Sequence, residues 1–331
     1  MNLVQFLDDS GVTRVARVVD DQTLAPLDGA MSMYDLVQDA LNSGVGLQDV
    51  VRKAEGAQRV SYDGLWRERR ILSPITHPDP AHMLVTGTGL THLGSADTRD
   101  AMHAKLSAAG DTLTDSMKMF RMGMEGGKPA EGQAGVQPEW FFKGDGSSVV
   151  PPEGDLLSPG FALDGGEEPE VAGIYVIAPD GRPRRLGFCL GNEFSDHKME
   201  RINYLYLAHS KLRPCSIGPE LRLGELPGTV LGHSRILRDG KTLWEKSFSS
   251  GEDNMSHSIA NLEAHHFKYA GFRRPGDVHV HFFGTSTLSF SDGVEAQPGD
   301  TFEISAEGFG KPLRNRIVVP AAEADFSPLP L

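Results

Sequence analysis

Apolar and polar positions alternate over many short stretches of the chain, and this pattern predicts a protein rich in β-strands. Near the start, residues 4–7 and 13–18 are strand candidates joined by Asp8-Asp9-Ser10-Gly11, a turn-forming tetrapeptide that suits a hairpin. Later strand candidates, separated by turns, are residues 83–86, 171–178, 184–191, 229–237, 277–283 and 301–306. Many short strands and few helices predict an α+β, β-rich fold, with a roll or barrel-like domain that carries its chemistry in the loops at one end.

Helical spacing of apolar residues is confined to a few segments. Ser32 is a candidate N-cap with Asp35 three residues later, and Met33, Leu36 and Val37 begin a helical pattern that residues 42–44 end. Further helices are predicted at residues 47–54, 97–108 and 261–269.

Prolines divide the chain into two parts. Pro74, Pro78 and Pro80 break regular structure and mark a linker. We therefore expect a small N-terminal α+β domain over residues 1–72, a linker over residues 73–82 and a catalytic domain over residues 83–331. The first 72 residues carry no recognisable chemistry, which favours a role as a lid or a support for a dimer over a role in substrate binding.

Composition narrows the function classes. The 331 residues are 39% hydrophobic and 23% charged, as in ordinary soluble globular proteins. A net charge of −13 argues against a nucleic-acid partner, because phosphate contacts need clustered lysine and arginine. Only two cysteines are present, which excludes a disulfide framework and suits a reducing cytoplasm. The start lacks the features of a signal peptide, and no apolar run reaches the length of about 20 residues that spans a bilayer.

Three glutamates are the leading candidates for chemistry. Glu168 and Glu170 are two residues apart at the entry of a predicted strand, so both side chains leave the sheet on one face, and Pro169 is tolerated at a strand start. The turn at residues 179–181 lets the next strand run back and bring Glu193 close. Converging carboxylates repel one another unless a hard cation such as Mg²⁺ lies among them. The alternative is a solvated acidic rim.

Eight segments, in order, resemble the catalytic domain of the fumarylacetoacetate hydrolase superfamily over roughly residues 83–320. They are Gly87-Thr-Gly-Leu-Thr-His92, Pro138-Glu-Trp-Phe-Phe-Lys143, Glu168-Pro-Glu170, Asn192-Glu-Phe-Ser195, Lys211 with Ser216-Ile-Gly-Pro219, Gly284-Thr285, Pro298-Gly-Asp300 and Leu313-Arg-Asn-Arg316. Within the superfamily, residues 204–219 look most like the 2-keto-3-deoxy-D-arabinonate dehydratase branch. The third acidic ligand of the superfamily is usually aspartate, where this chain has Glu193, and the position of a frequent arginine is taken by His197.

The resemblance implies a β-roll catalytic domain that binds Mg²⁺, with Mn²⁺ or Ca²⁺ as substitutes, in a cytoplasmic homodimer. The implied metal ligands are Glu168, Glu170 and Glu193. Lys211 is then either the base that removes a C3 proton or a cation that holds the enolate. The resemblance places His92 at the mouth of the pocket as a candidate proton donor for the leaving water, and the alternative is a structural histidine at a strand end. Implied substrate contacts are Lys143, Thr285 and Gly284, and the alternative for Lys143 is an ordinary surface lysine.

A 2-keto acid suits such a site, because its C1 carboxylate and C2 carbonyl can chelate Mg²⁺, which acidifies the C3 protons. Loss of water from a 2-keto-3-deoxy sugar acid then gives 2,5-dioxopentanoate from a five-carbon substrate. The alternative within enzymes is an acylpyruvate hydrolase that cleaves a C–C bond; hydrolase members commonly carry a His-x-x-Glu pair, where this chain has His92-Leu-Gly-Ser95. The alternative outside enzymes is a catalytically silent, β-rich binding protein.

Other features are expected to be structural. His279 and His281 share one face of a predicted strand, but no acidic ligand follows at short range, so a packed or exposed pair is favoured over a zinc or iron site. His265 and His266 lie on a predicted helix and are expected at the surface. The methionine-dense stretch of residues 117–124 is expected to pack, with a mobile cover over the site as the alternative.

Overall fold

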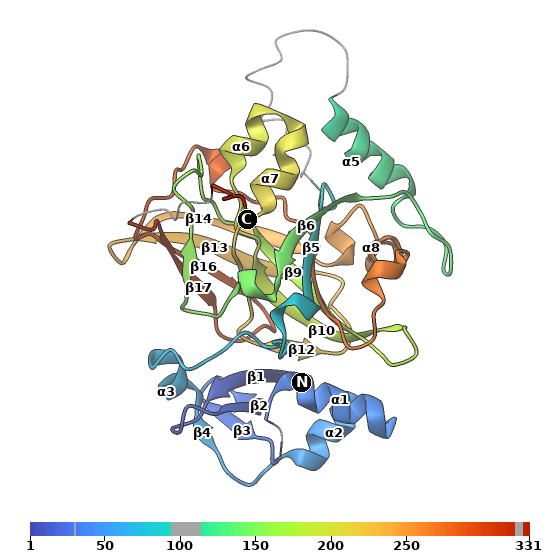
Figure 1. The fold of residues 1–331 in the computed structure, drawn as a ribbon, viewed down its shortest axis with the longest axis vertical. Helices are drawn as coiled ribbons and strands as arrows, with labels where there is room; N and C mark the ends of the chain where they lie inside the picture. Colours follow the sequence, from blue (N-terminus) through green and yellow to red (C-terminus); the bar gives the residue numbers. More distant parts are fainter. Residues whose placement is uncertain (30, 94–113, 322–326) are drawn as a thin grey trace.

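The computed structural model describes residues 1–29, 31–93, 114–321 and 327–331. Figure 1 shows a smaller N-terminal unit, which carries the N-terminus, beneath a larger β-rich body. The predicted helix at residues 97–108 lies outside the described residues. None of the helices in the described ranges has the length and apolar character needed to cross a membrane.

The N-terminal unit contains the predicted hairpin and the two predicted helices, together with two further short strands and a third helix that the pattern did not indicate. Its strands are β1 (Asn2–Leu7), β2 (Thr13–Asp20), β3 (Thr23–Pro26) and β4 (Val60–Ser61), and its helices are α1 (Met33–Ser43), α2 (Leu47–Ala54) and α3 (Tyr62–Arg67). Ser32 caps α1 by accepting a hydrogen bond from the backbone of Asp35, and Gly44 ends the helix in the left-handed conformation. The predicted hairpin and both predicted helices of this unit are therefore confirmed.

A single large sheet runs from this unit into the body of the protein. Its strand order is β4-β3-β2-β1-β12-β10-β9-β15-β5-β6, and β1 pairs with β12 through Leu3 and Leu221. The added strands are β12 (Leu221–Leu223), β10 (Pro183–Asn192), β9 (Pro169–Ile177), β15 (Val278–Phe282), β5 (Met83–Gly89) and β6 (Glu139–Asp145), with β7 (Val149–Val150) and β11 (Cys215–Ile217) beside β10. Because strands from both sides of the predicted linker pair in one sheet, the domain boundary at residue 72 stays a prediction.

A second sheet covers part of the first. Its order is β14 (Lys241–Ser250), β13 (Val230–Arg238), β16 (Thr301–Ala306), β17 (Leu313–Val318) and β8 (Asp155–Leu157). Val171 and Phe188 from the first sheet, with Phe283 just after β15, pack with Val230 and Ile304 from the second, and all five are buried. Alternate residues of β9 and β10 therefore fill this core, and the intervening ones face the opposite side of the sheet. The predicted α+β, β-rich class is confirmed.

The helices of the body lie around the sheets. They are α5 (Asp115–Gly126), α6 (His197–Ile202), α7 (Leu207–Lys211) and α8 (Ile259–Phe267), with 3₁₀ turns η1 (Pro80–His82), η2 (Gly146–Ser148), η3 (Tyr204–Tyr206), η4 (Glu252–Asn254), η5 (Ala270–Phe272) and η6 (Phe290–Asp292). Figure 1 shows α6 and α7 next to each other at the end of the body opposite the N-terminal unit. This end carries the acidic site described below.

Two expectations for surface and packing are wrong for some of the residues that they covered. His266 on α8 is fully buried. Burial is tolerated because both ring nitrogens have hydrogen-bond partners: Nδ1 accepts from the indole N–H of Trp140 at 3.3 Å, and Nε2 lies 2.9 Å from Nδ1 of His279. On α5, Met122 and Met124 are 46% and 53% exposed, so these two methionines do not pack inside the described structure. His279 and His281 are buried on β15, which agrees with the expectation of a packed pair.

Candidate metal centre

Three glutamates converge where the β9–β10 hairpin opens. Asn192 is paired with Pro169 and Gly191 with Glu170, and the backbone N–H of Glu193 donates to the carbonyl of Glu168 at 3.1 Å. Residues directly opposite each other in an antiparallel pair share a face, so Glu168 and Glu193 project to the same side as Glu170. One carboxylate oxygen from each lies within 4.8 Å of the others, and all three side chains are buried. The solvated acidic rim is therefore wrong, and the described part of the chain contains a candidate metal site here.

Glu170 is held by the loop that follows β15. The backbone N–H of Gly284 donates to Oε2 of Glu170 at 2.6 Å. Burial, together with the Glu193 and Glu168 carboxylates, raises the pKa of Glu170 well above its usual range. Positive charge placed among the three carboxylates would relieve this repulsion.

Lys211, at the end of α7, contacts two of the three glutamates. Its Nζ lies 2.5 Å from Oε1 of Glu168 and 2.5 Å from Oε2 of Glu193, and 3.1 Å from the hydroxyl of Ser195. Burial opposes ionisation of Glu168, but the Lys211 ammonium and the His197 ring outweigh it and hold the pKa of Glu168 well below its usual range. The predicted catalytic lysine and the predicted ligands are thus brought together in one place.

Lys143, on β6, lies on the other side of Glu193. Its Nζ is 2.6 Å from Oε1 of Glu193 and also donates to the carbonyls of Phe194 and Lys211 at 2.6 Å and 3.0 Å. These three acceptors match the three N–H donors of an ammonium group. Lys143 is buried, so the alternative of a surface lysine is wrong. Its substrate contact stays a prediction, and the observed contacts are those of a residue that fixes Glu193 and the adjacent backbone.

His92 is buried just after β5, deeper than the pocket mouth expected from the sequence. Its Nε2 lies 2.9 Å from the hydroxyl of Ser250 and its Nδ1 lies 3.1 Å from the hydroxyl of Thr91. Burial lowers the pKa of His92 to about 3, so the ring is neutral at pH 7. Because both ring nitrogens contact protein hydroxyls, these contacts suit a positioning role, and the role of proton donor stays a prediction.

Gly284 and Thr285 form the turn beside these residues. Gly284 has φ +97°, and a Cβ atom there would lie 2.4 Å from Oγ1 of Thr91 and 3.5 Å from Nδ1 of His92. Only glycine fits this conformation and this space. Oγ1 of Thr285 accepts a hydrogen bond from the backbone of Thr287 at 3.2 Å. The substrate contacts assigned to both residues stay predictions.

Two further residues lie beside the glutamates: His197, which the sequence marks only as a replacement for a frequent arginine, and Glu167, which the sequence does not single out. His197 lies 3.1 Å from Glu168 and 3.6 Å from Asp164. Burial opposes protonation of His197, but the two carboxylates outweigh it and raise its pKa to about 10. Glu167, next to Glu168, is fully buried and accepts hydrogen bonds from the backbone and hydroxyl of Ser289. For Glu167 the only signal in the sequence is its proximity to Glu168, whereas for His197 the resemblance marks a position near the third ligand without indicating its contact with Glu168.

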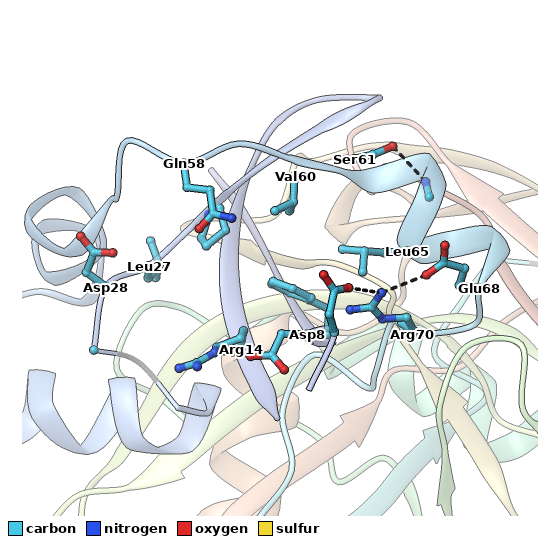
Figure 2. Close-up of a pocket in the computed structure, with 15 residues that line it drawn as sticks. Asp8, Arg14, Leu27, Asp28, Gln58, Val60, Ser61, Leu65, Glu68 and Arg70 are labelled. Carbon is cyan, nitrogen blue, oxygen red and sulfur yellow. Dashed lines mark hydrogen bonds and ion pairs between the residues drawn. The ribbon is translucent and has the colours of Figure 1, made fainter. Parts of the chain in front are cut away.

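A separate cavity of about 600 Å³ lies in the N-terminal unit (Figure 2). All its lining residues fall between Phe6 and Arg70, so none of the three candidate metal ligands lines it. Its arginines are paired with acidic neighbours, Arg14 with Asp8 at 2.9 Å and Arg70 with Asp9 at 2.8 Å. The cavity therefore presents no unpaired arginine for an acidic ligand.

Comparison with solved structures identifies the fold. The apo form of a 2-keto-3-deoxy-D-arabinonate dehydratase superposes with a TM-score of 0.70 at 19% identity, covering 97% of this chain and all of that one. The same enzyme complexed with magnesium and 2,5-dioxopentanoate gives 0.68 at 19% identity, covering 97% of this chain and 99% of that one. A 5-carboxymethyl-2-hydroxymuconate delta-isomerase from Mycobacterium smegmatis gives 0.57 at 16% identity, covering 97% of this chain and all of that one.

The predicted fumarylacetoacetate hydrolase-like fold is thereby confirmed. Among curated proteins, the chain is similar to a probable 2-keto-3-deoxyxylonate dehydratase from Haloferax volcanii, at 29% identity over 179 residues. That match spans 53% of this chain and 58% of the relative, little more than half of either. No family model matches the chain.

Proposed function

We propose that this protein is a Mg²⁺-dependent lyase that removes water from a 2-keto-3-deoxy sugar acid, converting a 2-keto-3-deoxy-D-pentonate to 2,5-dioxopentanoate. The observation that carries the proposal is the convergence of Glu168, Glu170 and Glu193 within 4.8 Å, with the Lys211 ammonium 2.5 Å from two of them. The solved relative that holds magnesium and 2,5-dioxopentanoate supports the choice of metal and product.

The residues present fit a magnesium ion. All three candidate ligands are carboxylates, the hard oxygen donors that Mg²⁺ prefers, and their mutual repulsion is relieved by a cation. When bound, Mg²⁺ would act as a Lewis acid toward the carboxylate and carbonyl oxygens of a 2-keto acid. The three glutamates would hold it. Burial raises the pKa of Glu193, and the Lys143 and Lys211 ammonium groups oppose that rise and hold its carboxylate in place.

In the proposed reaction the C3–H bond and the C4–O bond break, and the proton and hydroxide leave together as water. Lys211 is the side chain we assign to this step, because its Nζ lies at the glutamate cluster where the keto acid would bind. As a neutral amine it would take the C3 proton and pass it to the leaving hydroxyl group, and as an ammonium it would instead hold the enolate oxygen. Tautomerisation of the unsaturated product then gives the C5 aldehyde of 2,5-dioxopentanoate. The buried walls around the cluster exclude bulk water from this step.

Turnover of defined substrates tests the proposal. The purified protein with Mg²⁺ and 2-keto-3-deoxy-D-pentonate should form 2,5-dioxopentanoate, and EDTA should abolish the reaction. Glu170→Gln should lose metal binding and activity while it stays folded, whereas Glu245→Gln, at an exposed position on β14, should behave as wild type. Release of pyruvate from an acylpyruvate without any dehydration would instead establish the hydrolase alternative, and unchanged turnover in Glu170→Gln would remove Glu170 from the ligand set.

A further inference from the structure

The backbone at His197, which is not one of the three candidate ligands, is held by several hydrogen bonds. It begins α6, and Asp196 caps this helix by accepting a hydrogen bond from the backbone of Met199 at 3.0 Å. The other oxygen of Asp196 accepts from Arg213 at 2.9 Å and from the backbone of Leu163 at 2.9 Å. The backbone that carries His197 is therefore fixed from three directions.

The imidazole ring of His197 is closely packed by neighbouring side chains and backbone. Its ring stacks on Phe290 with centroids 5.2 Å apart and an interplanar angle of 23°, and its Nδ1 lies 3.6 Å from Oδ2 of Asp164. Gly166 forms one wall, since a Cβ atom there would come within 2.7 Å of Nδ1 and Cε1 of the ring. Only 1% of His197 is exposed. The ring can therefore point its Nε2 in one direction, toward Glu168.

Glu168 receives two donors on the same oxygen. Nε2 of His197 is 3.1 Å from Oε1 and Nζ of Lys211 is 2.5 Å from Oε1. The two donors come from different helices, α6 and α7, so the carboxylate is oriented from two sides. Groups that orient a metal ligand typically change metal affinity by about 10-fold to 100-fold when they are removed.

We propose that His197 is a positioning residue that orients Glu168 and thereby sets the affinity of the three-glutamate site for a divalent cation. The proposal rests on the proposed function only in requiring that Glu168, Glu170 and Glu193 hold a metal. Asp164, Gly166 and Phe290 support the ring, and of the three candidate ligands His197 has a hydrogen bond to Glu168.

Calorimetric titration of the full chain with MgCl₂ alone, without substrate, tests this role. His197→Phe keeps a ring on Phe290 and removes the donor, so magnesium affinity should fall about 10-fold to 100-fold. His197→Gln keeps an N–H near the position of Nε2 and should stay within about threefold of wild type, because its side chain can still orient Glu168. His233→Gln, at an exposed position on β13, is the control and should leave affinity unchanged.

Thermal unfolding of each variant separates positioning from a general loss of structure. If His197→Phe fails to fold, Asp164→Asn, which only weakens the support of the ring, should show a smaller loss of affinity at an unchanged melting temperature. Magnesium affinity that is equal to or higher than wild type in His197→Phe and in Asp164→Asn would overturn this inference and leave the proposed function standing. Absence of magnesium binding by the wild-type protein would overturn both.

Discussion

The backbone N–H of Gly284 donates to Oε2 of Glu170 at 2.6 Å, and this bond ties the loop after β15 to the middle ligand of the glutamate cluster. Gly284 can approach because it has no Cβ, which would meet Thr91 at 2.4 Å, and because its φ of +97° costs glycine nothing. A hydrogen bond from a fixed amide to a carboxylate limits the orientations of that carboxylate. The loop is therefore part of what shapes the metal site.

Gly284→Ala should weaken the site through this bond. The new methyl group must push against Thr91, which moves the amide away from Glu170, so we expect magnesium affinity to fall about 10-fold or more. The matched control is Gly299→Ala, because Gly299 has nearly the same φ, +98°, with nothing within 4 Å of an added Cβ. Both variants should lose stability from backbone strain, roughly 1–3 kcal/mol, but only Gly284→Ala should lose metal. Equal magnesium affinity in the two variants would show that the bond to Glu170 is dispensable.

Lys143→Met distinguishes a structural lysine from a substrate-binding one. Removal of the ammonium leaves Glu193 with one buried cation fewer and leaves the carbonyls of Phe194 and Lys211 without this donor, so the free energy of unfolding should fall by about 3 kcal/mol or more. Urea unfolding measures this loss, and Lys53→Met, at an exposed position on α2, is the control. A lysine that served the substrate alone would give the opposite pattern, with an increased KM at unchanged stability.

The buried histidines on β15 and α8 predict a loss of stability in acid. Burial lowers the pKa of His266 to about 4, and burial with the neighbouring His266 lowers that of His279 to about 3 and that of His281 well below its usual range. The unfolded chain takes up these protons below pH 6.5 and the folded protein does not. Stability from the neutral rings is therefore complete above pH 6.5 and is lost as the pH falls toward 4.

For each such ring, the free energy of unfolding should be about 2 kcal/mol lower at pH 5 than at pH 7.5. The measurement is urea unfolding across this range for the wild type and for His266→Phe, which retains a ring beside Phe272. The variant should take up about one proton fewer on unfolding, so its stability should depend less steeply on pH. An identical slope in the two proteins would mean that His266 is protonated in the folded state.

Much of the site follows from sequence alone because it depends on one hairpin. Period-2 alternation, the turn at residues 179–181 and the spacing of Glu168 and Glu170 together determine which face the carboxylates take, and the antiparallel register then delivers Glu193. The helix that begins after Ser32 was predictable for a similar reason, since its cap and its stop are both local signals.

The partners of these carboxylates were not predictable, because they come from distant elements. Lys143 is buried only because β6 meets the carbonyls of Phe194 and Lys211, and His197 turns inward only because Gly166 leaves room for its ring. The same limit explains the error at His266, where the helical pattern could not show that Trp140 and His279 would offer hydrogen bonds in the interior.

The central claim is that Glu168, Glu170 and Glu193 bind one divalent cation together. Anomalous diffraction from a crystal soaked with Mn²⁺ tests it most directly, because the metal is located without reference to activity. The account predicts one strong peak bonded to a carboxylate oxygen of each of the three glutamates, and no such peak in Glu170→Gln. A peak at another site, or none at saturating Mn²⁺ with the three side chains apart, would contradict it.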